Sequence, residues 1–251
     1  MMTPDQVEEA ARLLAAARSH QPIDELPHSC RPQSLEDAYQ IQDAVARRLG
    51  ETVGGWKVGV ATAATAAFCA PIYVRMIRPS PASYGASEVR LIGIEAEIAF
   101  RLGRDLPART QPWTRDEVAQ GATMHPVIEV VDSRYHDMRA VDRPQLLADN
   151  FSNGGLVWGA AVPGWEKLDL RHPAVKVTED GAAFAESNPE VARDPLGALV
   201  EFADIMNARG GVKAGTFVTT GTLTGLVFAP REAKILADFG ALGRVEAAFP
   251  A

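Results

Sequence analysis

The stretch Ile94-Glu95-Ala96-Glu97-Ile98-Ala99-Phe100 decides the fold of this chain. Apolar side chains alternate along it with Glu95 and Glu97, a period of two that is typical of a half-buried β-strand. The two glutamates share one face, roughly 7 Å apart, because a strand rises about 3.3 Å per residue. Like charges at this spacing repel unless a positive group lies between them, so a divalent cation with oxygen ligands is one explanation. The other explanation is a solvated outer face of an antiparallel strand.

A third carboxylate strengthens the first explanation. Glu129 lies within 127–131, an apolar run that predicts a buried strand. A carboxylate in such a strand is costly unless it binds a metal or is paired, for example with Arg134. Together with Glu95 and Glu97 it gives three carboxylates on strands. Three oxygen ligands of this kind suit octahedral Mg²⁺ or Mn²⁺ and leave positions open for a substrate.

Lys57 is a candidate catalytic residue. It lies in a short predicted strand, 53–60, with glycines at 54, 55 and 59. Glycines in a strand permit the close approach of another backbone or of a ligand. A lysine in these surroundings can have a lowered pKa or bind an anion. The alternative is a strand lysine that buries its stem and keeps its ammonium group in water.

Two polar turns are candidate substrate-binding segments. The turn 220–224 offers hydroxyl groups and backbone N–H groups beside glycines, which suit a carboxylate or phosphate. An ordinary hairpin turn has the same composition, and the polar loop 149–152 is equally unspecific. We take Ser152, Thr222 and Asp132 as the candidate substrate-binding residues.

The order of the predicted elements favours an α+β fold over a Rossmann-type fold. Helices come first, strands and turns follow, and neither a βαβ rhythm nor a glycine-rich phosphate loop is present. The residues up to about 52 resemble a small helical cap on a larger body. The predicted helices are 4–18, 35–49, 62–68, 115–122 and 196–208. The main predicted strands are 94–100, 127–131, 156–162, 216–220, 232–238 and 243–249.

Composition narrows the possible partners and location. The 251-residue chain has a net charge of -7, which argues against nucleic acid or an anionic membrane as the main partner. No signal peptide and no membrane-spanning apolar run is indicated. Cys30 and Cys69 form neither a disulfide framework nor a zinc motif, so we expect reduced thiols in a cytoplasmic protein. The five histidines are scattered and do not suggest a nucleophilic triad.

Five motifs in one order resemble the 2-keto-4-pentenoate hydratase and 4-oxalocrotonate decarboxylase family, within the fumarylacetoacetate hydrolase superfamily. They are Gly-Trp-Lys-Val-Gly at 55–59, Ile-Glu-Ala-Glu-Ile-Ala-Phe at 94–100, Val-Ile-Glu-Val-Val-Asp-Ser-Arg at 127–134, Ala-Asp-Asn-Phe-Ser at 148–152 and Thr-Gly-Thr-Leu-Thr-Gly at 220–225. The resemblance implies a fumarylacetoacetate-hydrolase-like mixed β-sheet roll with peripheral helices. On this basis we expect an N-terminal helical cap over residues 1–52 and a catalytic β-roll domain over residues 53–251.

The resemblance also implies roles for the candidate residues. It makes Glu95, Glu97 and Glu129 the ligands of Mg²⁺ or Mn²⁺, and Lys57 the active-site lysine. The turn around Thr222 corresponds to the part that receives the substrate carboxylate. Family members are commonly homo-oligomers that act on small 2-oxo or 2-hydroxy-dienoic acids.

The activity implied is a metal-dependent hydratase, a lyase that adds water to 2-hydroxypenta-2,4-dienoate-type substrates in aromatic meta-cleavage degradation. Its products are 4-hydroxy-2-oxo acids. Ile72 stands where the hydratases carry an acidic residue, and Val74 replaces a glycine. Ile72 leaves open a 2-oxo-3-enedioate (4-oxalocrotonate) decarboxylase. Further alternatives are an acylpyruvate-type C–C hydrolase and a binding protein without catalytic activity.

Overall fold

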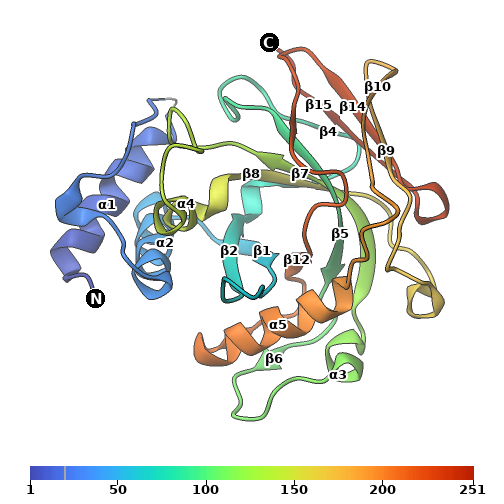
Figure 1. Cartoon of the computed structure of the whole chain (residues 1–251), viewed down its shortest axis with the longest axis horizontal. Coiled ribbons are helices and arrows are strands. Elements are labelled where there is room, and N and C mark those ends of the chain that lie inside the picture. Colours follow the sequence, from blue (N-terminus) through green and yellow to red (C-terminus); the bar gives the residue numbers. More distant parts are fainter. Residues whose placement is uncertain (20) are drawn as a thin grey trace.

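Two mixed β-sheets with helices at their edges make up the protein (Figure 1). The structure is a computed structural model that describes residues 1–19 and 21–251, so His20, one of the five histidines, lies outside the described residues. The strands of the larger sheet are β1 (Val53–Gly59), β2 (Phe68–Tyr73), β3 (Ile77–Pro79), β5 (Gly93–Arg101), β7 (Thr123–Val131), β8 (Asn153–Trp158), β12 (Phe217–Thr219) and β13 (Val227–Phe228). Those of the smaller sheet are β4 (Ala82–Ser83), β9 (Lys176–Glu179), β10 (Ala182–Glu186), β14 (Lys234–Asp238) and β15 (Arg244–Ala248). The other elements are the paired strands β6 (Leu106–Pro107) and β11 (Gly211–Val212) and the helices α1 (Pro4–Ala17), α2 (Leu35–Leu49), α3 (Arg115–Ala119), α4 (Arg143–Ala148) and α5 (Pro195–Ala208).

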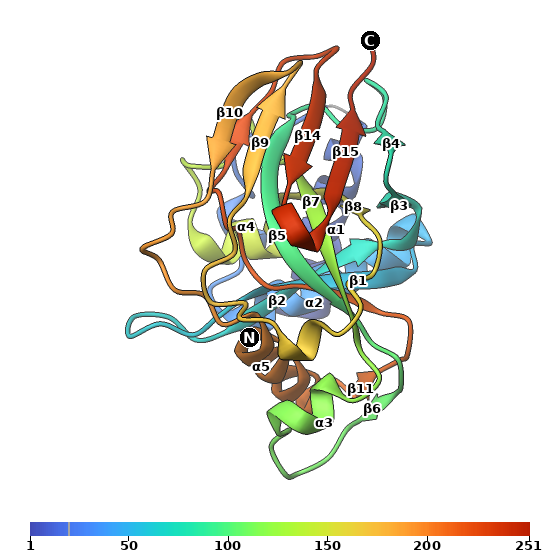
Figure 2. The same ribbon diagram turned by 90° about the vertical axis from the view of Figure 1, so that its right-hand side faces the viewer.

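The larger sheet has the strand order β2-β1-β12-β5-β7-β8-β3, with β13 paired to β5. The pairs β1–β12 and β3–β8 are parallel and the other pairs are antiparallel. The smaller sheet has the order β10-β9-β14-β15-β4 and packs through β15 on β7 and β8 (Figure 2). The sheets are mixed and the helices lie at their edges, which confirms the predicted α+β class.

The central strand β5 has the predicted alternation. Ile94, Ala96, Ile98 and Phe100 are fully buried on one face, where they join the main hydrophobic core. The other face, which carries the glutamates, also points into the protein and not into solvent. The strand is therefore buried on both sides, and the predicted alternative of a solvated glutamate face is wrong for Glu97, which is 2% exposed.

The two N-terminal helices begin at the predicted residues, 4 and 35. The Thr3 side chain accepts a hydrogen bond from the Gln6 N–H, and the Ser34 side chain accepts one from the Asp37 N–H. α1 packs on α2, and α2 packs on α4 and β2 (Figure 1). Their buried residues belong to the same core cluster as those of the larger sheet. The domain boundary at residue 52 stays a prediction.

Three predicted elements need correction. Residues 62–68 do not form a helix: the chain turns there, and β2 begins at Phe68 and pairs with β1. Alanine favours a helix, but this segment has no apolar face to bury, and its Thr62 side chain instead accepts hydrogen bonds from the N–H groups of Ala64 and Thr65. α3 ends at Ala119 rather than 122, and β8 covers Asn153–Trp158 rather than 156–162. Among the described residues, no helix is long and apolar enough to span a membrane.

Replacement of Gln42 by leucine is expected to destabilise the whole chain and not the helices alone. Gln42 is fully buried in α2 and its Nε2 donates to the Leu147 carbonyl in α4, at 2.6 Å. Leucine leaves that carbonyl unpaired, at a cost of about 1–3 kcal/mol. Urea unfolding followed by tryptophan fluorescence, which reports on residues outside 1–52, measures the change. An unchanged midpoint would show that residues 1–52 unfold independently and would support a domain boundary there.

Candidate active site

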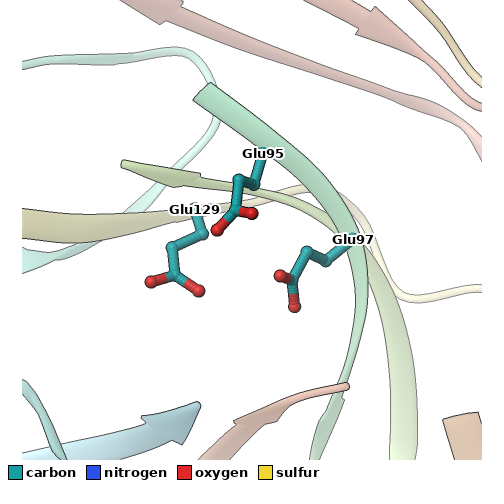
Figure 3. A group of neighbouring side chains, drawn as sticks. All are labelled: Glu95, Glu97 and Glu129. Atoms are coloured by element: carbon teal, nitrogen blue, oxygen red, sulfur yellow. The ribbon is translucent and has the colours of Figure 1, made fainter. Parts of the chain in front are cut away.

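β5 and β7 bring the three predicted carboxylates together. Antiparallel pairing places Glu95 directly opposite Glu129, and Glu97 follows two residues later on the same face of β5. One carboxylate oxygen from each residue lies within 4.8 Å of the others. Figure 3 shows the three side chains pointing into the same space. Hard oxygen donors at this separation can hold a divalent cation.

Burial makes this cluster electrostatically costly without a cation. Glu129 is 0% and Glu97 is 2% exposed, whereas Glu95 is partly exposed. Burial, followed by the charges of Glu129 and Glu95, raises the pKa of Glu97 to about 8. The pKa of Glu95 is also raised, mainly by burial. The backbone N–H of Gly221 donates to Glu97 Oε2 at 2.9 Å and partly offsets this cost.

Lys57 supplies the positive charge closest to the carboxylates. It lies opposite Thr219 of β12, and its Nζ is 2.6 Å from Glu129 Oε1 and 3.9 Å from Glu95 Oε2. Burial opposes the charge on Lys57, but these two carboxylates outweigh burial and raise its pKa. The expectation of a lowered pKa is therefore wrong for the metal-free protein, and so is the alternative of a solvated ammonium group, because Lys57 is buried.

Glu129 has a second partner that the sequence did not reveal. Asn153 Nδ2 donates to Glu129 Oε1 at 3.0 Å. The other oxygen, Oε2, is buried and has no hydrogen-bond partner among the described residues. The expected alternative partner, Arg134, forms a buried ion pair with Asp149 instead. A buried carboxylate oxygen without a hydrogen-bond partner is suited to be the ligand of a metal ion.

A strained turn before β8 completes one wall of the site. Asn150, Phe151 and Ser152 all have left-handed backbone conformations, with φ of 51°, 47° and 56°. Such conformations are costly for residues other than glycine and cluster at functional sites. In this turn the Phe151 carbonyl accepts a hydrogen bond from Lys57 Nζ at 3.3 Å. The Ser152 hydroxyl is buried without a partner among the described residues, and its contact with a substrate stays a prediction.

The turn 220–224 lies beside β5, as the site requires. Its Leu223 N–H donates to the Ala96 carbonyl at 2.8 Å, and its Gly221 N–H is the donor to Glu97. Thr222 Oγ1 is buried and, within the described chain, has no hydrogen-bond partner. The sequence predicted a glycine-containing turn with backbone N–H donors here, but it did not predict that the Gly221 N–H donates to Glu97.

Asp132 is placed differently from the other candidates. Its carboxylate accepts hydrogen bonds from the backbone N–H groups of Leu91 at 2.8 Å and Arg90 at 3.3 Å. These contacts fix the segment that enters β5. The structure therefore gives Asp132 a positioning role, and its contact with a substrate stays a prediction.

Part of the remaining inner wall beside the carboxylates is apolar. Ile72 lies opposite Gly55, two residues before Lys57 on the same face of β1. It packs in a separate buried hydrophobic cluster, against which His125 and the Arg101 guanidinium also pack. The members of this cluster are Ile72, Ala99, Val127, Leu156 and Phe217, with Ile77 and Trp158 packed against them.

The chain is similar to enzymes of known activity over nearly its whole length. A 2-keto-4-pentenoate hydratase of Paraburkholderia phymatum is 31% identical, with 96% of this chain and 95% of that protein covered. A 4-oxalocrotonate decarboxylase of Pseudomonas putida is 29% identical, with 86% of each chain covered. No model of a known protein family matches the chain.

The chain is also similar to solved structures of related enzymes. The 4-oxalocrotonate decarboxylase from Pseudomonas putida G7, complexed with magnesium and adipate, superimposes with a TM-score of 0.85 at 25% identity over 99% of both chains. A fumarylpyruvate hydrolase from Pseudomonas aeruginosa has a TM-score of 0.56 at 16% identity, over 78% of this chain and 88% of that one, which shows a shared fold.

These similarities place the chain in the 2-keto-4-pentenoate hydratase and 4-oxalocrotonate decarboxylase family. The predicted family and the predicted fumarylacetoacetate-hydrolase-like fold are therefore confirmed. The protein is an enzyme of the lyase type, as its hydratase relatives are.

Replacement of Lys57 by methionine is expected to destabilise the metal-free protein by about 3–5 kcal/mol, because Glu129 loses the cation beside it. Saturating Mg²⁺ should reduce this difference, since a bound cation supplies the missing positive charge. Thermal or urea unfolding with and without Mg²⁺ measures both effects. Lys213→Met is the control, because Lys213 is exposed and its one ion-pair partner among the described residues is the surface residue Asp105. A loss of stability that Mg²⁺ does not change would contradict a cation site beside Lys57.

Proposed function

We propose that Glu95, Glu97 and Glu129 bind Mg²⁺ or Mn²⁺. The observation that carries this proposal is the convergence of three buried or partly buried carboxylates, with Glu129 Oε2 unpaired among the described residues. Three hard oxygen donors suit these two ions better than softer metals. The magnesium complex of the Pseudomonas putida G7 decarboxylase supports the same choice.

The function that we infer is hydration of 2-hydroxypenta-2,4-dienoate-type substrates to 4-hydroxy-2-oxo acids, in the meta-cleavage degradation of aromatic compounds. It is supported by the hydratase relatives at about 30% identity over most of the chain. A bound divalent cation would supply Lewis-acid polarisation of the substrate's 2-oxygen.

The side chains of the protein provide the remaining steps. Lys57 Nζ is held between Glu129 and the Phe151 carbonyl, where it can donate a proton to the substrate or hold its 2-oxygen. The unpaired hydroxyl groups of Ser152 and Thr222 are suited to bind the substrate carboxylate. The apolar wall around Ile72 excludes bulk water from the far side of the site.

Glu97→Gln is expected to lower metal affinity and activity together. Glutamine keeps the size of the side chain but loses the negative charge, so kcat/KM should fall by about 100-fold or more. Calorimetry with Mg²⁺ and the metal-dependent loss of dienoate absorbance measure the two effects. Glu246→Gln, on the exposed side of β15, is the matched control. Full activity and unchanged Mg²⁺ binding in Glu97→Gln would refute the proposed ligand set.

A second candidate is decarboxylation of 2-oxo-3-enedioates, and Ile72 is the observation that favours it. By the family resemblance, Ile72 occupies the position of the hydratases' acidic residue, and it packs in a buried hydrophobic cluster. Loss of CO₂ requires no added water, and apolar surroundings destabilise the leaving carboxylate relative to neutral CO₂.

The two activities are separated by supplying both substrates to the Mg²⁺-loaded protein. We expect 2-hydroxypenta-2,4-dienoate to be consumed, with a product heavier by one water in mass spectrometry. Release of CO₂ from 2-oxo-3-hexenedioate, without consumption of the dienoate, would assign the protein to the decarboxylases instead.

Hydrolysis of an acylpyruvate C–C bond is not supported by the site. His125 is the histidine on the carboxylate face of β7, two residues before Val127. Its Nδ1 is bonded to the Gly159 carbonyl at 2.8 Å and its Nε2 to Thr123 Oγ1 at 2.9 Å. With both nitrogens engaged, and with its pKa lowered by burial, this histidine lacks a free position to act as the base.

We also propose that the enzyme is a cytoplasmic homo-oligomer. The location is supported by Cys30 and Cys69, both buried free thiols. The assembly is supported by the family resemblance, and light scattering of the purified protein gives the number of subunits.

A further inference from the structure

A second polar cavity lies beside the carboxylate cluster and shares Asn153 with it. Its volume is about 30 Å³, and it is lined by the end of α1, the segments flanking β5 and β7, and the strained turn before β8. Arg18 contributes from the helical cap, Tyr73 from the end of β2, and Asn150 from the turn. The cavity thus joins the N-terminal helices to the segment that positions Lys57.

The charged groups around this cavity leave a surplus of positive charge. Arg18 and Arg90 have no carboxylate partner among the described residues, whereas Asp132 is the one lining carboxylate without a basic partner. Within the described chain, the Arg90 side chain donates to the backbone carbonyls of Ser133 and Tyr135 and to no carboxylate. The other charged side chains form ion pairs: Arg134 with Asp149, Arg75 with Glu51, and Glu88 with Arg78.

Several polar atoms of the residues that line the cavity are also without partners in the described part of the chain. They are Arg18 Nε, the Tyr73 hydroxyl and Asn150 Oδ1. Tyr73 is 2% and Asn150 1% exposed, so their missing partners have to lie inside the protein and not in bulk solvent. The Arg18 guanidinium lies over the Tyr73 ring, 5.1 Å from its centre. Buried polar atoms of this kind are rarely left unpaired in proteins, which indicates that a water or an ion lies between them.

The charge on Arg18 fits this conclusion. Burial, and repulsion by Arg134, lower the pKa of Arg18 to about 10, so it remains a cation at neutral pH. The Asp149 carboxylate offsets part of this cost, but it is already paired with Arg134, so the half-buried Arg18 cation still favours an accompanying anion. The Asn150 amide can turn either its oxygen or its NH₂ group toward a ligand, since the two orientations have the same shape.

We propose that the cavity binds one small monovalent anion, of the size of chloride or formate, between Arg18, Tyr73 and Asn150. The size follows from the volume, which leaves room for little more than one small ion. Through Asn150 the anion would stabilise the turn whose Phe151 carbonyl accepts from Lys57. Through Asn153 it would support Glu129. Anion binding itself does not depend on the proposed enzymatic activity.

The test compares the full-length protein in sodium chloride, sodium formate and sodium gluconate at equal ionic strength. Gluconate is too large for the cavity and serves as the reference anion. At about ten times its dissociation constant, chloride or formate should raise Tm by about 3 °C or more. Arg18→Met should abolish this shift. Arg12→Met should retain it, because Arg12 is exposed on the same helix and pairs with Glu9.

Two further measurements cover the case in which Arg18→Met does not fold. Tyr73→Phe removes only the hydroxyl donor and should weaken the chloride effect by several fold. A crystal grown in bromide should show an anomalous peak between Arg18 and Tyr73. Three results would overturn the proposal. They are equal Tm values in chloride, formate and gluconate, an undiminished Tm shift in Arg18→Met or Tyr73→Phe, and a cavity that contains only water.

Discussion

The interaction on which the site depends is the contact of Lys57 with Glu129 inside the sheet. Glu129 is fully buried, so its charge requires a cation close by, and Lys57 Nζ lies 2.6 Å away. The pairing register of β5 and β7 adds a second carboxylate beside this contact, because it places Glu95 opposite Glu129. A slip by one residue would move the glutamates of one strand to the other face and separate the cluster. Register, burial and charge therefore specify the site together.

The surrounding segments are organised to support this arrangement at some cost. Residues 150–152 adopt three successive left-handed conformations, which a folded protein maintains only where other contacts impose them. Here the buried pair of Arg134 with Asp149 and the hydrogen bond from Asn153 to Glu129 impose them. The turn in return directs the Phe151 carbonyl at Lys57. The strained backbone of this turn thus helps to fix the position of the Lys57 ammonium group.

The sequence predicted the features that depend on local pattern. The alternation in β5 predicted both its strand and the face of its glutamates, and the helical pattern predicted the starts of α1, α2 and α5 to within one residue. Glu129 was recognisable because a carboxylate within an apolar run requires a partner. The Ala-rich segment 62–68 was mispredicted because pairing of β2 with β1 overrides helix propensity.

Features that depend on contacts distant in sequence could not be predicted. Nothing in the sequence identifies Asn153 as a donor to Glu129, because that pair is set by the register of β8 on β7. The raised pKa of Lys57 likewise arises from carboxylates on two other strands. The glycines near Lys57 indicated an unusual environment, but the direction of its pKa shift could be determined only from the positions of the neighbouring carboxylates.

Charge balance explains why a divalent cation, and not a second lysine, suits the cluster. Three ionised glutamates carry three negative charges, of which Lys57 neutralises one, so a divalent ion brings the cluster to neutrality. Without the ion, the raised pKa of Glu97 keeps part of the cluster protonated and lowers the repulsion. An anionic 2-oxo acid then enters a site without net charge, where the apolar wall around Ile72 strengthens its interactions with the few polar groups. The apolar wall and the acidic cluster therefore act as two parts of one electrostatic arrangement.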